Sequence, residues 1–235
     1  MIDPALINSN IAELSRRIRL AEQENGRDAN SVTLMAVSKT RPAQAIRDGV
    51  TAGLSQFGEN YILEALDKQA LLVDLGICWH YIGPIQSNKS RAVATHFDWV
   101  HTIDRKKIAQ RLSDQRPPEL PLLEVCLQVN IDQESQKAGV IAAEIDALAA
   151  TVAALPRLRL RGLMAIPAPR DNYHEQRQVF ARVRHCFETL RQQHPTVDTL
   201  SMGMSRDYGA AIAEGATLIR VGTEIFGPRE TPPTP

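Results

Sequence analysis

The stretch LEVCLQVN, residues 123–130, is the clearest strand in the sequence. It is short and almost continuously apolar, it follows the proline-rich segment 116–121, and it ends on the polar Asn130. Strands that are covered by helices on both faces have this composition, and they belong to parallel sheets. We therefore predict a buried strand here and look for others like it on either side.

Short apolar runs of the same kind recur along the chain. They lie at 33–39, 56–60, 78–83, 99–104, 160–166, 199–204 and 217–222. Segments with helical spacing of apolar residues alternate with them, at 42–52, 61–72, 87–96, 105–113, 142–155, 173–193 and 208–214. Strands that alternate with helices form right-handed βαβ units. With a further helix expected at 4–25, the pattern predicts an α/β fold, a single (β/α)8 TIM barrel with an extra N-terminal helix. An open doubly wound sheet is the alternative.

The domain organisation follows from the absence of a composition break. No Pro/Gly/Ser-rich linker divides the chain, and the segment 116–121 is too short to separate two domains. We expect residues 1–230 to form a single domain. The tail TPPTP at 231–235 has the composition of a disordered segment.

Composition excludes several classes of function. The 235 residues carry 27 basic and 27 acidic side chains, so the chain lacks the basic field of a nucleic-acid-binding protein. No apolar run approaches the ~20 residues of a membrane span, and the N-terminus lacks a signal-peptide pattern. The three cysteines are expected to be reduced, as in a cytoplasmic protein. No H-E-x-x-H or C-x-x-C motif points to a metal site.

Lys39 is the most informative candidate site residue. It ends the buried run 33–39, whereas the other five lysines fall in helical stretches or in a polar loop. Barrel enzymes carry their chemistry at the C-terminal ends of the strands. A partly desolvated amine at that position suits a Schiff base with a carbonyl compound such as pyridoxal phosphate (PLP). The alternative is a lysine that reaches solvent or pairs with a carboxylate.

Two loops near the end of the chain have the features of a phosphate site. In this fold the loops after strands seven and eight often bind phosphate. Ser205 follows the first of these strands and offers a hydroxyl, with capping of the next helix as the alternative role. Gly222 and Thr223 follow the second, where glycine permits close backbone approach and threonine adds a hydroxyl. A simple turn is the alternative for that pair.

Arg220 and His80 are weaker candidates. Arg220 shares a strand face with Gly222, so an inward orientation would bring its guanidinium toward a ring held between Lys39 and the phosphate. A cation beside a pyridine nitrogen disfavours ring protonation and weakens an electron sink. The alternative is an outward arginine paired with a carboxylate. His80 either faces the pocket or is a core histidine. The segment 83–90 imitates a P-loop, but its second glycine is replaced by asparagine.

Six segments together resemble the pyridoxal phosphate homeostasis protein family, the YggS/PROSC group. They are AVSKT at 36–40, FGENY at 57–61, HYIGPIQSNK at 80–89, GLM at 162–164, SMGMS at 201–205 and RVGTEIFG at 220–227. The resemblance spans nearly the whole chain, with the motifs in order. It implies a barrel like the N-terminal domain of alanine racemase, with PLP held as a Schiff base.

The resemblance also implies a role for each matching residue. Lys39 would carry PLP, Ser205, Gly222 and Thr223 would bind its phosphate, and Arg220 would face its pyridine ring. Asn60 and Met164 match positions that line the cofactor pocket. Asn130 and Lys137 match the stretch after the fifth strand, where a second lysine could assist PLP handling. The chain departs from the family pattern at Arg206, an added cation, and at Gly209, where members often have glutamate.

The resemblance favours a non-catalytic function. Family members have no established turnover and are thought to buffer or deliver PLP, with effects on amino-acid and keto-acid pools. We expect a cytoplasmic monomeric carrier whose recipients are PLP-dependent apo-enzymes, with no nucleic-acid or membrane partner. The alternative is a low-activity PLP-dependent amino-acid racemase that uses Lys39 or Lys137 as a base.

Overall fold

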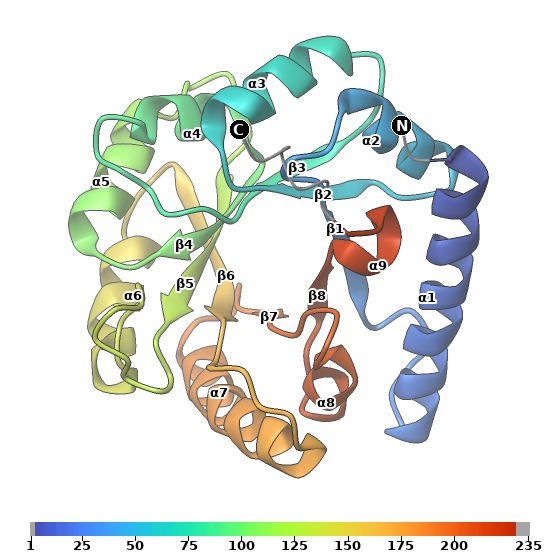
Figure 1. The fold of residues 1–235 in the computed structure, drawn as a ribbon. Coiled ribbons are helices and arrows are strands. Elements are labelled where there is room, and N and C mark those ends of the chain that lie inside the picture. The colour runs from blue at the N-terminus through green and yellow to red at the C-terminus, as the bar shows by residue number, and fades with distance from the viewer. Residues whose placement is uncertain (1–2, 229–235) are drawn as a thin grey trace.

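All strands in the described part of the chain belong to one closed parallel barrel, whose strands neighbour one another in sequence order until β8 pairs with β1 (Figure 1). The computed structural model describes residues 3–228. The strands are β1 Thr33–Val37, β2 Gln56–Glu59, β3 Cys78–Tyr81, β4 Trp99–Ile103, β5 Leu123–Val129, β6 Leu158–Ala165, β7 Thr199–Ser201 and β8 Leu218–Val221. The predicted barrel is therefore confirmed, and the open sheet is excluded. The tail 231–235 lies outside the described residues.

Helices form the outer layer of the barrel (Figure 1). They are α1 Pro4–Glu24, α2 Ala43–Thr51, α3 Ile62–Leu71, α4 Ser90–His96, α5 Lys106–Gln115, the short 3₁₀ helix η1 Ala142–Glu144, α6 Ile145–Ala153, α7 Tyr173–Gln193, α8 Tyr208–Ala213 and α9 Thr223–Phe226. The extra helix α1 contacts α2, α8 and α9, so it fills the part of the outer layer beside the β1–β8 seam. Its apolar stripe, which includes Ile7, Leu14 and Ile18, is buried there.

A buried carboxylate fixes α1 to the start of β1. Glu22 is 1% exposed and accepts hydrogen bonds from the backbone N–H groups of Asn30 and Val32, at 3.1 and 2.7 Å. Arg19 pairs with the same carboxylate at 2.8 Å. Because a buried charge is stable only with partners, these contacts hold the extra helix in one position.

Local differences from the predicted elements lie at helix and strand ends. The segment 142–155 divides into η1 and α6, the short helix α9 follows β8 directly, and β7 is only three residues long. Such boundaries depend on tertiary contacts that periodicity does not encode. The three cysteines are unpaired within the described residues, and no helix in residues 3–228 is long and apolar enough to cross a membrane.

Candidate functional site

A cavity of about 400 Å³ opens at the C-terminal ends of four adjacent strands, β6, β7, β8 and β1. Its volume lies in the range typical of small-ligand sites. Of the predicted site residues, six line it: Lys39, Ser205, Arg206, Arg220, Gly222 and Thr223. The structure thus brings together residues that are up to 184 positions apart (39 and 223) in the sequence.

The backbone that carries Lys39 is held on both sides by polar contacts. Lys68 of α3 donates from Nζ to the carbonyl oxygen of Ser38 at 2.8 Å. Glu64, one turn earlier, accepts from the backbone N–H of Thr40 at 2.5 Å. Thr40 has a φ of 64°, a left-handed conformation that is uncommon for a non-glycine residue and that needs surrounding support.

Lys68 itself is a buried cation at the centre of this clamp. It is 4% exposed, and it pairs with the fully buried Glu59 at 2.7 Å and with Glu64 at 2.5 Å. Ser38 donates its hydroxyl to the same Glu59 oxygen at 2.6 Å. Burial raises the pKa of Glu59, and the ammonium of Lys68 acts in the opposite direction. The network fixes the position from which the half-buried Lys39 reaches the cavity.

Arg220 places a buried positive charge at the floor of the cavity. Its side chain points inward, which is one of the two predicted orientations, and the residue is 4% exposed. Both hydrogen bonds of its guanidinium go to uncharged acceptors, Ser201 Oγ at 2.8 Å and the carbonyl oxygen of Ala165 at 2.9 Å. Burial lowers the pKa of Arg220 to about 10, so the guanidinium remains charged at neutral pH. The carboxylate of Asp207 acts in the opposite direction: it raises the pKa of Arg220 by charge attraction, without a hydrogen bond to the guanidinium.

The loops after β7 and β8 approach the cavity with different local structures. Helix α8 has Asp207 as its N-cap residue, so the alternative role of Ser205 as that cap is wrong. The Asp207 carboxylate instead accepts from the backbone N–H of Met204 at 2.6 Å. At Gly222, a Cβ atom would lie 2.9 Å from the carbonyl oxygen of Val37. Glycine therefore allows the ends of β8 and β1 to approach each other closely.

Asn60 and Met164 lie outside the lining of the cavity. Met164 is fully buried within β6, one residue before the carbonyl group that accepts from Arg220. Asn60 follows β2, and its Oδ1 is buried without a hydrogen-bond partner among the described residues. A buried acceptor that lacks a partner is costly unless a ligand satisfies it.

Asn130 and Lys137 shape a neighbouring loop and do not line the cavity. The Asn130 side chain accepts from the backbone N–H of Glu134 at 3.1 Å and donates to the carbonyl oxygens of Glu134 and Lys137, at 2.8 and 3.2 Å. Lys137 pairs with Glu134 at 2.5 Å. The loop reaches the site through Asp132, which pairs with Arg170 at 2.8 Å. Arg170 lines the cavity.

The comparisons with known proteins agree with this geometry. The family described as "Alanine racemase, N-terminal domain" matches residues 2–230. Proteins called "Pyridoxal phosphate homeostasis protein" are 57% identical in Pseudomonas aeruginosa and 54% identical in Escherichia coli. The matches cover 95% of this chain in both cases, and 96% and 97% of the respective relatives.

The chain belongs to the pyridoxal phosphate homeostasis protein family. A solved structure of PipY from Synechococcus elongatus, described as having PLP bound, is 39% identical to this homeostasis family member. The match has a TM-score of 0.81 and covers 94% of this chain and 100% of PipY. The relatives are named for homeostasis and not for a reaction.

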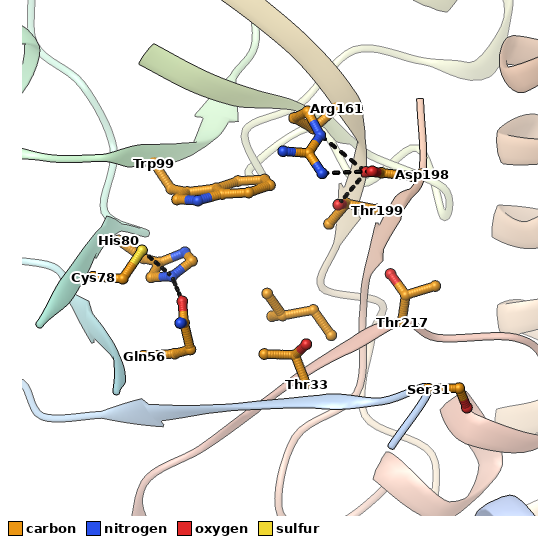
Figure 2. A pocket seen from close by; sticks show the side chains of 11 residues that line it. Ser31, Thr33, Gln56, Cys78, His80, Trp99, Arg161, Asp198, Thr199 and Thr217 are labelled. Atoms are coloured by element: carbon orange, nitrogen blue, oxygen red, sulfur yellow. Dashed lines mark hydrogen bonds and ion pairs between the residues drawn. The ribbon is translucent and has the colours of Figure 1, made fainter. Parts of the chain in front are cut away.

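Of the two predicted alternatives for His80, the one in which it faces the pocket of Lys39 is wrong, whereas its 1% exposure agrees with a core histidine. His80 instead lines a second cavity, of about 440 Å³, at the N-terminal ends of the strands (Figure 2). It lies there with Gln56, Cys78 and Trp99, close to where their strands begin. The two-residue period of a strand predicts that His80 points inward, but the stagger of the barrel decides which mouth it approaches.

His80 and His101 give the protein an expected pH dependence. Burial lowers the pKa of His80 to about 3. Burial also lowers the pKa of His101, with smaller contributions from charge repulsion by a protonated His80 and by Arg220. The unfolded chain binds protons at both imidazoles below about pH 6.5, whereas the folded chain does not, so stability is complete above that pH and falls below it. Urea unfolding should show a loss of about 2–3 kcal/mol between pH 7.5 and 5.5.

A matched variant separates these histidines from other titrating groups. His101→Gln keeps a hydrogen-bonding side chain but removes one imidazole, so it should roughly halve the loss. Equal stability of the wild type at the two pH values would contradict the prediction.

Sequence reasoning missed Arg170 and Lys68, which shape the site. It also missed His101, whose Nδ1 lies 3.1 Å from Ser201 Oγ, the atom that accepts from Arg220. Arg170 stands in the β6–α7 loop, and its position just after a strand end was the available signal. Lys68 has the i, i+4 spacing to Glu64 that usually marks an exposed helix pair. His101 gave no signal, because a histidine in an apolar strand resembles any core residue.

Proposed function

We propose that the protein holds PLP in the cavity at the C-terminal mouth of the barrel and acts as a PLP carrier or buffer in intracellular PLP homeostasis, with effects on amino-acid and keto-acid balance. The observation that carries this proposal is the meeting of Lys39, the two loops after β7 and β8, and the buried Arg220 in one cavity. The PLP named in the description of the PipY structure supports the same ligand.

The charges of the cavity fit this cofactor. Its lining includes the cations Lys39, Arg170, Arg206 and Arg220, against the carboxylates of Asp171 and Asp207. A site with surplus positive charge and a buried guanidinium bonded only to neutral acceptors favours an anionic ligand. Unpartnered Asn60 Oδ1 is a further polar atom that a ligand could satisfy.

We assign the following contacts to PLP. When bound, PLP supplies an aldehyde that condenses with a primary amine and a phosphate that accepts hydrogen bonds. Lys39 provides the amine and so holds PLP as a Schiff base. Ser205, Gly222 and Thr223 hold the phosphate, and Arg206 adds charge beside it. Arg220 faces the pyridine ring, where its permanent charge disfavours protonation of the ring nitrogen.

We also assign Asn60, after β2, and Met164, in β6, to the cofactor site, although neither lines the cavity in this structure. Asn130 and Lys137 act, in this proposal, on the loop that carries Asp132 and not as primary ligands. Their contacts with Glu134 support this reading.

The proposal treats the protein as a carrier and not as an enzyme. The alternative, a low-activity amino-acid racemase, requires a base that can remove an α-proton. Incubation of the PLP-loaded protein with amino acids in D₂O separates the two functions. A carrier leaves the α-carbon unlabelled, whereas deuterium incorporation at about 1 s⁻¹ or faster would favour the racemase.

We propose a single-domain monomer of the cytoplasm that hands PLP to PLP-dependent apo-enzymes and that binds neither nucleic acid nor membranes. The balance of 27 basic and 27 acidic residues and the three unpaired cysteines support this setting.

Borohydride reduction followed by peptide mapping tests the central claim. The wild-type protein, incubated with PLP, should become yellow and should retain PLP permanently after reduction. Mass spectrometry of the digested protein should then find the modification on the peptide that contains Lys39. A protein that takes up no added PLP, or that carries it only on another lysine, would refute the proposal.

A further inference from the structure

A continuous row of buried polar side chains crosses the interior of the barrel from one mouth to the other. It begins at Arg220 in the cavity of Lys39 and continues through Ser201, His101 and His80 to Gln56. Gln56 and His80 line the second cavity, at the N-terminal mouth (Figure 2). The two histidines and Ser201 are at most 1% exposed. The proposed contacts with PLP do not account for these residues.

The proton positions in this row follow from the one member that can only donate. The Arg220 guanidinium contains only N–H donors and no acceptor atom, and it donates to Ser201 Oγ at 2.8 Å. The Ser201 hydroxyl can then donate to His101 Nδ1, 3.1 Å away. A neutral imidazole that accepts at Nδ1 carries its proton on Nε2. Arg220 therefore selects one of the two tautomers of His101.

The proton position of His80, near the N-terminal mouth, follows in the same way. His101 Nε2 lies 2.9 Å from His80 Nδ1, which must accept, so His80 is also protonated on Nε2. His80 Nε2 lies 2.7 Å from Gln56 Oε1, an atom that can only accept (Figure 2). In this orientation of the amide, the Gln56 nitrogen donates to Ser55 Oγ at 3.2 Å. Every bond in the row then runs in one direction.

The opposite direction is less favourable. If His101 donated from Nδ1, Ser201 Oγ would accept from both His101 and Arg220. The hydroxyl hydrogen of Ser201 would then have no acceptor on either of these two side chains. At the other end, the Gln56 amide would have to turn so that its nitrogen donates to His80 Nε2. Buried polar hydrogens without acceptors cost free energy, so the single direction is preferred.

We propose that His101, supported by His80, is a positioning residue for Arg220. By accepting from Ser201, His101 fixes the hydroxyl so that its oxygen lone pairs face the guanidinium. The carbonyl oxygen of Ala165 holds the second amino group, at 2.9 Å. These two contacts set the orientation in which Arg220 meets the ring of its ligand. The effect on ligand binding rests on the proposed PLP function, whereas the row of hydrogen bonds does not depend on it.

The first test concerns the row alone and needs no cofactor. In the protein labelled with ¹⁵N-histidine and prepared without PLP, NMR shifts should show both His80 and His101 as neutral imidazoles protonated on Nε2. A proton on Nδ1 of His101 would overturn the proposal, whatever the protein does with PLP.

The second test compares two substitutions at His101. His101→Gln can still accept from Ser201 and donate toward His80, so PLP affinity should stay within about twofold of the wild type. His101→Met fills the space without either bond. It should weaken PLP binding about three- to tenfold, the scale of one hydrogen bond between uncharged groups, and should shift the absorption maximum of bound PLP.

A third variant protects the test against a misfolded protein. Ser201→Ala removes one oxygen atom and breaks the same row beside Arg220, so it should shift the absorption maximum in the same direction. Wild-type affinity and spectrum in folded His101→Met or Ser201→Ala would overturn the proposal. If the wild type binds no PLP, the proposed function fails, which the NMR result distinguishes from failure of the row.

Discussion

Lys39→Ala should retain no PLP after borohydride reduction and should stay colourless. Among residues 3–228, Lys39 is the one lysine that lines the cavity with Arg220 and Ser205. An alanine there removes the amine that we propose to hold PLP covalently, while the phosphate loops remain intact. PLP should then bind only through non-covalent contacts and should be removed by gel filtration.

Lys137→Ala is the matched control for this prediction. Lys137 is half-buried and pairs with Glu134 outside the cavity lining, so its loss should leave the covalent PLP in place. Absorbance and intact mass after reduction measure both variants. If Lys39→Ala keeps the PLP mass and Lys137→Ala loses it, the assignment of the two lysines is reversed.

Lys68→Met should destabilise the protein by about 3–5 kcal/mol, because it leaves a buried carboxylate without its cation. Glu59 is fully buried, and its ion pair with Lys68 is 2.7 Å long. The same substitution removes the bond to the carbonyl oxygen of Ser38, next to Lys39. We therefore also expect weaker PLP retention in the fraction that folds. Urea unfolding measures the first effect and PLP titration the second.

Two further variants test the physical reason. Lys68→Met combined with Glu59→Gln removes both charges, so it should recover part of the lost stability. Lys89→Met replaces an exposed lysine and should change stability by no more than about 0.5 kcal/mol. Equal stability of Lys68→Met and Lys89→Met would show that the clamp contributes little.

The barrel could be predicted because its signal is local and repeated. Residues 123–130 were predicted as a strand, and β5 is Leu123–Val129. The helix α7, Tyr173–Gln193, has the predicted bounds. Apolar runs of this kind must be buried on both faces, so each one indicates a parallel strand without knowledge of the others. The end of β7 at Ser201 was less predictable, because a chain leaving a sheet can remain extended.

The site was predictable only where position along a strand decides the outcome. Lys39, Ser205, Gly222 and Thr223 follow strand ends, and in a parallel barrel all such ends lie at the same mouth. The burial of Lys68 and Glu59 could not be predicted from the sequence, because it depends on how α3 packs against the ends of β1 and β2. The stagger of the strands likewise placed His80 at the opposite mouth, a property that no single strand carries.

The seam between β1 and β8 has a consequence for the order in which the protein is made. Lys39 lines the cavity from one side of this seam, and residues 204–207, 220, 222 and 223 line it from the other. On the ribosome, Lys39 is synthesised well before the residues on the other side of the cavity. A ligand that needs both sides cannot be captured before residue 223 has been made, so its binding marks a chain in which β8 has already closed the ring against β1.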